Sequence, residues 1–344
     1  MNLPIEYAVV EQVTAQPNLL RTILSLTIGK RVIRYIPDGF VLVKMAAAPF
    51  NPSDIAFLQG SYNVKKPLPA VPGFEGAGIV VAVGDNVDGS LIGRKVSCFA
   101  GSEGDGTWAE YLLARPEQLL AFENDLSWEM ASTLLVNPFT AWAMFELAKQ
   151  STTRTIALNA AGSRVAYWLR TFAQRYGISV IDVVRKPETA AQLVAKGSQY
   201  VLVSTDEKFQ ENFHHVTRQL DCTMAFDAVG GSLGAQMLNA MPPNSRLVVY
   251  GGLSNLPLGD LDVLGLIFKG KKVEGFDLNQ WWASNSSETK LQVAREISLH
   301  MLSRDYQGQI SQSVRLDDVV SGLRHYLGHM SQGKVLLSFD PEVT

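Results

Sequence analysis

Residues 155–184 read TIALNAAGSRVAYWLRTFAQRYGISVIDVV, and this stretch decides the fold class of the chain. Its two ends, Thr155–Asn159 and Ser179–Val184, are short apolar runs that predict buried strands. Between them, Val165–Tyr176 predicts a helix, because its apolar residues recur every three or four positions. A strand, a helix and a second strand of these lengths form a right-handed βαβ unit, in which the two strands are parallel.

The same alternation continues towards the C-terminus. Further strands are expected at residues 200–203, 224–227, 246–250 and 272–276, with helices at 190–196 and 233–241. Ser204, followed three residues later by Glu207, forms a capping-box pattern that predicts a helix beginning directly after the third strand. Strands that alternate with helices in this way predict an α/β domain with a parallel sheet.

The chain has a different character before residue 130. Short β-type runs such as Ile28–Tyr35 are separated there by segments rich in glycine and proline, which predicts a compact β domain. The tail returns to helices at about residues 288–303 and 317–329 and ends in a strand at 334–339. We expect this last strand to rejoin the first domain, because the sequence gives it no neighbour in the parallel sheet.

Composition and charge exclude several classes of protein. The 344 residues include 30 basic and 33 acidic residues, a net charge of −3, which leaves no basic footprint for nucleic acid. Two cysteines, Cys98 and Cys222, are too few for a disulfide framework or a four-cysteine zinc site. No apolar run approaches the ~18 residues of a membrane span, and Met1–Glu6 lacks the features of a leader peptide. We therefore expect an unprocessed cytoplasmic protein that contacts neither membrane nor nucleic acid.

The turn after the first parallel strand is where dinucleotide-binding proteins carry G-x-G-x-x-G. Here the three glycine positions hold Ala161, Ser163 and Ala166, and Gly162 falls in a spacer position. A strand precedes this turn and a helix follows it, so N–H groups at the helix start would face a pyrophosphate. The candidate phosphate-binding residues are Ala161, Gly162, Ser163, Arg164 and Val165. Arg164 either bonds a phosphate or fills the site, and a turn that binds no cofactor is the alternative.

A pair of cations, Arg185 and Lys186, follows the second parallel strand. NAD sites usually place an acid at this strand end, whereas NADP sites place a cation there. Asp182 has the spacing of such an acid, but two valines follow it and place it inside the strand. The cationic pair suits a 2′-phosphate, because arginine can bond two of its oxygens. The pattern favours NADPH, with a solvated basic pair as the alternative.

Outside these segments the sequence offers few reactive groups. Tyr62 lies in an expected loop, where it could donate a proton or stabilise an oxyanion. A packed surface tyrosine is the alternative, and from the local sequence alone it is the commoner case. His325 and His329 are four residues apart on an expected helix, but a third ligand and the glutamate of H-E-x-x-H are missing. We therefore expect no metal.

Several segments together carry a family resemblance. They are residues 51–54 (NPSD), 59–62 (QGSY), 72–78 (PGFEGAG), 93–96 (GRKV), 106–108 (GTW), 136–141 (VNPFTA), 226–231 (FDAVGG), 250–252 (YGG) and 266–269 (LIFK). In their order and spacing the chain resembles the medium-chain dehydrogenase/reductase superfamily over nearly its whole length. Within the superfamily it is most similar to the zinc-free 2-enoyl thioester reductases and quinone oxidoreductase-like proteins.

This resemblance implies a two-domain fold. A GroES-like β domain is built from both ends of the chain, residues 1–130 and 284–344, and a Rossmann domain with a doubly wound parallel sheet is built from residues 131–283. The resemblance places the active site in the cleft between the domains. Proteins of this kind are usually homodimers that join their Rossmann sheets edge to edge.

The resemblance also implies an NADPH-dependent reductase that transfers hydride to the activated double bond of a small-molecule 2-enoyl thioester. Tyr62 matches a tyrosine that assists hydride transfer, and Asn51 matches an asparagine that helps to shape the site. A phenol of pKa ~10 stays protonated at pH 7 and can donate a hydrogen bond to the developing enolate oxygen. The cofactor residues expected from the matching motifs are Asn137, Thr140, Tyr250, Gly251 and Gly252. Thr140 and the two glycines would line the nicotinamide pocket.

Two alternative functions stay open. The first is NADPH-dependent reduction of quinones or free enones by the same fold. The second is a non-catalytic relative that binds partners, because the glycine-poor turn at Ala161, Ser163, Arg164 and Ala166 is also what a decayed cofactor site would leave.

Overall fold

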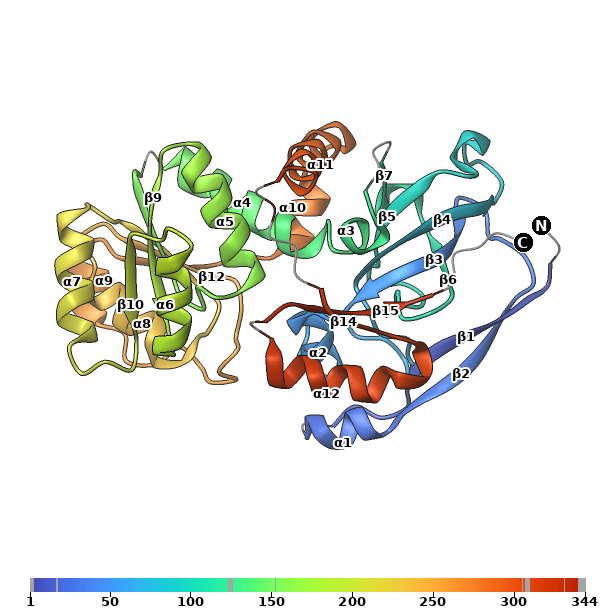
Figure 1. Cartoon of the computed structure of the whole chain (residues 1–344), viewed down its shortest axis with the longest axis horizontal. Helices are drawn as coiled ribbons and strands as arrows, with labels where there is room; N and C mark the ends of the chain where they lie inside the picture. Colours follow the sequence, from blue (N-terminus) through green and yellow to red (C-terminus); the bar gives the residue numbers. More distant parts are fainter. Residues whose placement is uncertain are drawn as a thin grey trace. The chain divides into compact units, whose positions relative to one another are not determined.

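The computed structural model describes residues 3–16, 18–122, 126–151, 153–304, 306, 310–330 and 332–339. The chain divides into two units, of which the first comprises Met1–Val136 with Asn285–Thr344 and the second comprises Asn137–Ser284. Figure 1 labels most of the helices and strands of both units. In the described ranges no helix is long and apolar enough to cross a bilayer.

A six-stranded sheet forms the centre of the second unit. Its strands are β8 (Thr155–Leu158), β9 (Ser179–Val184), β10 (Tyr200–Val203), β11 (Met224–Asp227), β12 (Arg246–Val249) and β13 (Lys272–Gly275). They lie in the order β10-β9-β8-β11-β12-β13, and every neighbouring pair is parallel. Counted along the chain this is 3-2-1-4-5-6, the order of a Rossmann sheet. The prediction of an α/β fold with a doubly wound parallel sheet is confirmed.

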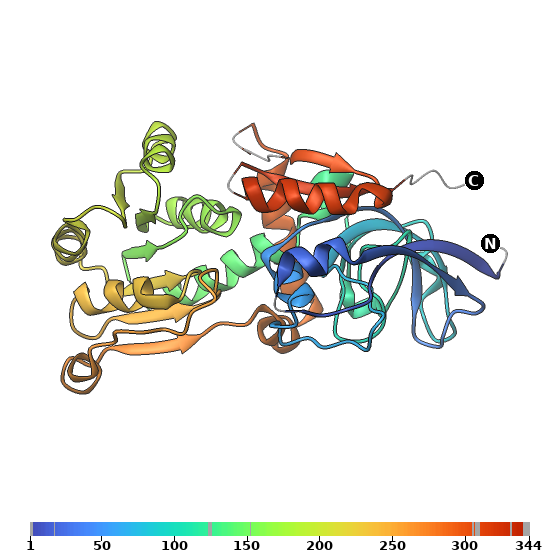
Figure 2. The ribbon, with the colours of Figure 1, turned by 90° about the horizontal axis from the view of Figure 1, so that it is seen from below.

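Helices surround this sheet in Figures 1 and 2. They are α4 (Val136–Gln150), α5 (Arg164–Arg175), α6 (Pro187–Ala195), α7 (Phe209–Gln219), α8 (Gly231–Ala240), α9 (Val263–Phe268) and α10 (Leu278–Ser284). Right-handed connections run outward from β8 in one direction and from β11 in the other, so α5 and α6 cover one face of the sheet, and α8 and α9 cover the opposite face. The expected helix at 165–176 is α5, which buries Leu169 and Phe172. The helix after β10, α7, begins at Phe209 and not directly after the strand as expected. The reason is that the Ser204 N–H continues the strand pairing by donating to the Val184 carbonyl.

The first unit is built mainly from antiparallel β-structure, with one parallel pair between β14 and β15. Its strands are β1 (Ile5–Gln12), β2 (Leu26–Ile33), β3 (Val41–Pro49), β4 (Glu75–Val83), β5 (Lys95–Phe99), β6 (Tyr111–Ala114), β7 (Leu119–Ala121), β14 (Ile310–Val314) and β15 (Lys334–Ser338). β1 and β2 form a two-stranded ribbon, and the other strands form a sheet of order β14-β15-β3-β4-β5-β7, with β6 also paired to β3. The last strand, β15, pairs antiparallel with β3, as the sequence predicts for the end of the chain.

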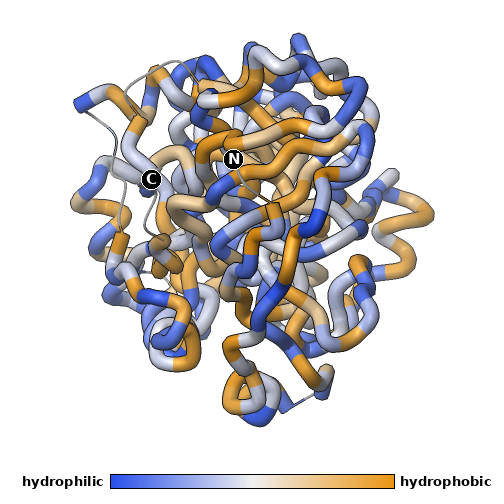
Figure 3. Tube along the Cα trace, turned by 90° about the vertical axis from the view of Figure 1, so that its right-hand side faces the viewer, coloured by the Kyte–Doolittle hydropathy of each residue, from blue (hydrophilic) through white to orange (hydrophobic). Residues whose placement is uncertain are grey.

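Both ends of the chain supply the core of this unit. Its helices are α1 (Leu19–Leu24), α2 (Pro52–Leu58), α3 (Trp128–Ser132), α11 (Ser287–Met301) and α12 (Val319–His329). The Phe50 ring lies 4.8 Å from Trp108 and 6.2 Å from Tyr326 of α12 between ring centroids, in edge-to-face contact. Figure 3 colours the chain by hydropathy, and apolar and polar stretches are interspersed over it. In β3 every residue except Lys44 is buried, so this strand lies inside the unit along its whole length.

Candidate active site

The loops that follow β8 and β11 meet at the point where the order of the parallel sheet reverses. Asn159 directly follows β8 and Asp227 ends β11, and both side chains are buried. The Asn159 amide donates to the Asp227 carboxylate at 2.5 Å and accepts the Ala228 N–H at 2.8 Å. The two loops are thus fastened to each other at the crevice where sheets of this order bind ligands.

The turn after β8 presents the start of α5. Ala160 takes a left-handed backbone conformation, with φ of 46°, and Ser163 is the N-cap residue that accepts the Ala166 N–H at 3.2 Å. A Cβ at Gly162 would lie 2.9 Å from the Thr189 methyl group of α6, so a larger residue at this position would require the Thr189 side chain to shift. Helix starts leave first-turn N–H groups without intrahelical partners. The predicted residues 161–165 therefore form one turn that suits an anion.

Arg170 and Asp182 form a buried pair beneath this turn. The Arg170 guanidinium donates to the Asp182 carboxylate at 2.7 Å and to the Ala161 carbonyl at 2.8 Å. Burial raises the pKa of Asp182, and Arg170 opposes that shift. Asp182 lies inside β9, where it bonds the Arg170 side chain that in turn bonds the turn at Ala161. It therefore does not lie at the strand end, where an NAD site would use an acid.

Arg185 and Lys186 lie at the strand end itself. Both are exposed, and neither forms an ion pair with another part of the chain that the structure describes. The Arg185 carbonyl accepts the Thr205 hydroxyl at 3.1 Å, which fixes the main chain and leaves the guanidinium outside. Arg164, by contrast, places its guanidinium 4.3 Å from the centre of the Tyr167 ring on the same helix. The exposed cations Arg185 and Lys186 at the end of β9 therefore suit a 2′-phosphate. The Arg164 side chain lies instead along its own helix, α5.

Tyr250 and the two glycines after it complete the same edge of the sheet. Burial raises the pKa of Tyr250, and a hydrogen bond with Ser163 lowers it. A Cβ at Gly251 would lie 2.7 Å from the Ala228 carbonyl oxygen, so β12 can approach β11 this closely only with glycine there. Gly252 is exposed. The structure thus brings Tyr250 to the predicted phosphate-binding turn and Gly251 to the loop after β11.

Asn137 and Thr140 belong to a separate element of the second unit. They lie three residues apart in α4, and both are nearly buried, with exposed fractions of 7% and 9%. Residues three apart on a helix share a face. Together these features fit an NADP-type nucleotide, for which the turn at 161–165 offers N–H donors and the end of β9 offers cations.

In the first unit, Tyr62 lies four residues beyond the end of α2. Its N–H donates to the Ala56 carbonyl at 3.2 Å, and its half-buried ring lies 4.9 Å from the Phe74 ring. Phe57 packs on the other side of this small cluster, 5.7 Å from Phe74. Tyr62 is therefore a partly exposed phenol held by both its main chain and its ring.

Asn51 is fully buried in the first unit. Its amide donates to the Glu75 carboxylate at 2.8 Å and accepts from the Lys334 ammonium group. The Glu75 carboxylate also accepts the Leu135 and Val136 N–H groups at 3.2 and 2.8 Å. Because its side chain has no exposed surface, Asn51 can influence a reaction only through the groups that it holds.

Sequence reasoning missed the carboxylates and the ammonium group of this network. Asp54 accepts the Asn51 N–H at 2.7 Å and the Phe74 N–H at 3.1 Å. Burial raises the pKa of Asp54 to about 7 and also raises that of Glu75, while Lys334 lowers both. The spacing of Asn51 and Asp54 is typical of a helix start, and this pattern could have predicted that Asp54 bonds the Asn51 N–H. Nothing in the sequence points to Lys334.

The described residues contain no group of three or more histidine, cysteine, aspartate or glutamate side chains that could hold a metal ion. His325 and His329 stack on each other, with ring centroids 4.5 Å apart. His329 Nδ1 bonds the His325 carbonyl at 3.0 Å. These two side chains are thus engaged with each other along α12.

The order of the parallel sheet and the residues at its edge define a nucleotide-binding Rossmann unit, and comparison with known proteins narrows the class. Residues 37–124 match the family model of the alcohol dehydrogenase GroES-like domain. The mitochondrial enoyl-[acyl-carrier-protein] reductase of Rattus norvegicus is 33% identical over 277 residues, which cover 79% of this chain and 72% of the rat protein. The chain belongs to the enoyl-[acyl-carrier-protein] reductase family, in the zinc-free branch of the medium-chain dehydrogenase/reductase superfamily.

Solved structures agree with this assignment. A candidate NADPH:quinone reductase from Mesorhizobium loti is 26% identical, with a TM-score of 0.88 over 98% of this chain and 100% of that one. The mitochondrial 2-enoyl thioester reductase Etr1p/Etr2p heterodimer from Candida tropicalis, at 21% identity, shares the fold with a TM-score of 0.80 over 97% of this chain and 100% of that one. The predictions of an oxidoreductase and of NADPH as its cofactor are confirmed at the level of these relatives.

One prediction is contradicted. The sequence analysis expects a cytoplasmic protein, but the enoyl-[acyl-carrier-protein] reductases that the chain matches in rat, Caenorhabditis elegans and human are named as mitochondrial. Composition carries no information that separates these two compartments, since both are compatible with few cysteines and a small net charge.

Proposed function

We propose that this protein reduces the carbon–carbon double bond of a 2-enoyl thioester with NADPH. The observation that carries the proposal is Tyr62, a partly exposed phenol held at a fixed place by Ala56 and Phe74. The names of the family members support the substrate class, and one structural neighbour is described as a complex of Etr1p with NADP and crotonyl-CoA.

Each part of the second unit has a role in this proposal. Arg185 and Lys186 bind the 2′-phosphate, the start of α5 binds the pyrophosphate, and Thr140 with Gly251 lines the nicotinamide pocket. When bound, NADPH supplies the hydride, and the protein supplies orientation. The buried Asn159–Asp227 pair keeps the two loops of the sheet edge at a constant separation.

Tyr62 acts on the charge that the reaction creates. Addition of hydride at the β-carbon moves negative charge to the thioester oxygen, and a phenol O–H donates a hydrogen bond to that oxygen. A donor fixed before the reaction stabilises such charge without reorganising. Loss of one such donor costs on the order of 10²-fold in rate.

The test compares Tyr62→Phe with Tyr35→Phe, which removes the hydroxyl of a 71% exposed tyrosine in the same unit. Rates of NADPH oxidation are measured with a short 2-enoyl-CoA and with a quinone. We expect Tyr62→Phe to lower kcat for the enoyl thioester about 10²-fold and Tyr35→Phe to leave it unchanged. A quinone reductase would instead show fast quinone reduction that Tyr62→Phe barely alters. Unchanged enoyl reduction in Tyr62→Phe would overturn the assignment of this residue.

We also propose that the protein is a homodimer joined at β13. This strand is the end of the six-stranded sheet, and an end strand presents main-chain groups that can pair with a second copy. The neighbouring helix α9 adds exposed apolar side chains. They are Val263, Leu264, Ile267 and Phe268, exposed by 60%, 61%, 62% and 77%.

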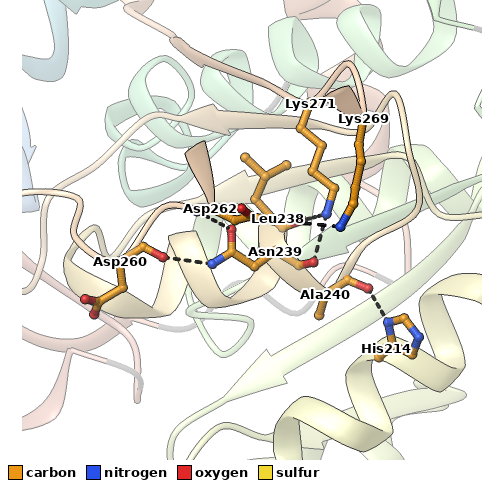
Figure 4. Close-up of polar contacts among 8 residues, drawn as sticks. All are labelled: His214, Leu238, Asn239, Ala240, Asp260, Asp262, Lys269 and Lys271. Atoms are coloured by element: carbon orange, nitrogen blue, oxygen red, sulfur yellow. Dashed lines mark hydrogen bonds and ion pairs between the residues drawn. The ribbon is translucent and has the colours of Figure 1, made fainter. Parts of the chain in front are cut away.

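Both ends of α9 are fastened to the end of α8, as Figure 4 shows. The Lys271 ammonium group donates to the carbonyls of Leu238 and Asn239 at 2.7 and 2.8 Å. The Asn239 side chain donates to the Asp260 carbonyl at 2.8 Å and accepts the Asp262 N–H at 3.0 Å. Since Asp262 precedes α9 and Lys271 follows it, the helix is held with these apolar side chains outward.

Light scattering after size exclusion tests the dimer. Phe268→Asp places a charge in the apolar patch and should give a monomer. Leu299→Asp makes the same change at a 65% exposed leucine on α11 and should leave the dimer intact. A wild-type monomer, or a dimer in both variants, would contradict this interface.

A further inference from the structure

A buried carboxylate lies in α2, the helix to which the Tyr62 main chain is bonded, and takes no part in the proposed reaction. Asp54 is in the first turn of α2 and is fully buried. Its two oxygens bond different segments, since one accepts the Asn51 N–H at the start of α2 and the other accepts the Phe74 N–H directly before β4. The carboxylate therefore ties α2 to the segment that leads into β4.

Tyr62 depends on both of the segments that Asp54 joins. Its main chain is bonded to α2, because the N–H groups of Ser61 and Tyr62 donate to the Ala56 carbonyl at 2.9 and 3.2 Å. Its ring is packed on Phe74, whose main chain Asp54 holds. If α2 and Phe74 move apart, one of these two attachments of Tyr62 is lost.

We infer that Asp54 is a positioning residue for Tyr62, which it keeps at a fixed place by joining α2 to Phe74. The inference rests on the proposed function, in which Tyr62 donates to the substrate oxygen. Asp54 does not touch substrate or cofactor, because its side chain has no exposed surface.

The charges around Asp54 explain why a carboxylate can remain there. Glu75 of β4 and Lys334 of β15 face it with opposite charges, Lys66 lies in the loop beyond Tyr62, and Tyr326 of α12 packs near both carboxylates. Burial raises the pKa of Asp54 to about 7, and Lys334 opposes that shift. A protonated Asp54 keeps one full acceptor oxygen, so one of its two N–H bonds, and with it the tie between α2 and Phe74, weakens as pH falls through about 7.

The test is a double-mutant cycle on Asp54→Asn and Tyr62→Phe. An amide has one acceptor oxygen, so Asp54→Asn keeps only one of the two N–H bonds. Asp88→Asn is the matched control, since Asp88 accepts the Ser90 N–H at 2.9 Å at the exposed start of the short 3₁₀ helix Gly89–Leu91. Initial rates are measured with NADPH and a short 2-enoyl-CoA between pH 6 and 9, with circular dichroism melts to confirm folding.

We expect Asp54→Asn to lower kcat about tenfold at pH 8, with the KM for NADPH unchanged, and Asp88→Asn to match the wild type. In the Tyr62→Phe background the same change should lower kcat less than twofold, because a residue that acts through the phenol has nothing left to position. A structural role alone would lower kcat equally in both backgrounds.

The outcomes separate the two proposals. If Tyr62→Phe leaves enoyl reduction unchanged, the function proposed for Tyr62 fails. If Tyr62→Phe is slow but Asp54→Asn is as fast as wild type, or is equally damaging in both backgrounds, the positioning role fails. Phe74→Leu covers the case in which Asp54→Asn does not fold. It removes the ring contact and retains the N–H bond, so it should also lower kcat, and only when Tyr62 is present.

Discussion

Adjacent glycines after β12 offer a direct test of how closely the parallel strands must approach. A Cβ at Gly251 would lie 2.7 Å from the carbonyl oxygen and 3.2 Å from the Cα of Ala228. Both are backbone atoms, so neither can rotate away. The end of β12 is also held by N–H bonds from Tyr250 and Gly251 to the Asp227 carbonyl, at 2.9 and 3.3 Å. Gly252 has no heavy atom within 4 Å of such a Cβ.

Gly251→Ala should therefore destabilise the protein and Gly252→Ala should not. Forcing an extra carbon into a packed site typically costs about 1–3 kcal/mol, whereas an exposed change stays within about 0.5 kcal/mol. Neither glycine has φ in the left-handed region, so backbone strain does not separate the two variants. For a folding unit of about 150–250 residues each kcal/mol lowers Tm by about 2–4 °C, and the second unit, Asn137–Ser284, is close to this size.

Thermal and urea unfolding followed by circular dichroism measure the difference without cofactor. We expect a Tm lower by about 2–12 °C in Gly251→Ala and within about 1–2 °C of the wild type in Gly252→Ala. NADPH titration by fluorescence should then show weaker binding to Gly251→Ala, because the shifted strand carries Tyr250 away from Ser163. Equal unfolding midpoints in the two variants would refute the reasoning from strand separation.

Three further predictions follow from the site. Asn159→Ala should lower the free energy of unfolding by about 2–4 kcal/mol and weaken NADPH binding, because it leaves the Ala228 N–H without its acceptor and removes a donor from Asp227. Urea unfolding measures the loss. The control Asn212→Ala, at an exposed position, should lower the free energy of unfolding by less than about 0.5 kcal/mol. The double variant Arg185→Ala/Lys186→Ala should reduce the preference for NADPH over NADH at least tenfold in fluorescence titration, with NADH affinity and the Lys196→Ala control unchanged. Burial raises the pKa of Asp54 in the folded protein from 3.8 to about 7. The contribution of its protonated form to stability is therefore fully present below about pH 4 and is lost as pH rises through 7. Urea unfolding from pH 4 to 8 should show that the free energy of unfolding falls less in Asp54→Asn, which does not titrate, than in the wild type.

The fold could be predicted from sequence because its signals are local. The apolar spacing in residues 165–176 marks α5, and the apolar runs on either side mark β8 and β9. The start of α7 was misplaced because Ser204 satisfies its N–H by strand pairing, a contact with Val184 twenty residues away. Local capping patterns cannot reveal that a tertiary partner has already taken the N–H group.

The site was less visible because its organising contacts join distant segments. Asn159 and Asp227 are 68 residues apart, and Asn51 and Lys334 are 283 apart. Residue types and short spacings predict a role for the exposed cations Arg185 and Lys186, and the family resemblance predicts one for the half-buried Tyr62; all three roles stay predictions. These signals did not identify the buried groups, whose value lies in which partner the fold brings to them.

The two units solve the same problem in the same way. In each, an asparagine just beyond a strand donates to a buried carboxylate, Asn159 to Asp227 at 2.5 Å and Asn51 to Glu75 at 2.8 Å. The asparagine oxygen then accepts from a further segment, the Ala228 N–H in one unit and Lys334 in the other. An amide suits this position because it carries a donor and an acceptor without a charge. An aspartate at either position would place its carboxylate against the buried carboxylate of Asp227 or Glu75. Two like charges in a buried site repel each other and would destabilise the fold. The glycine-poor turn is therefore compatible with a working cofactor site, since the positions of its loops depend on this buried pairing as well as on glycine.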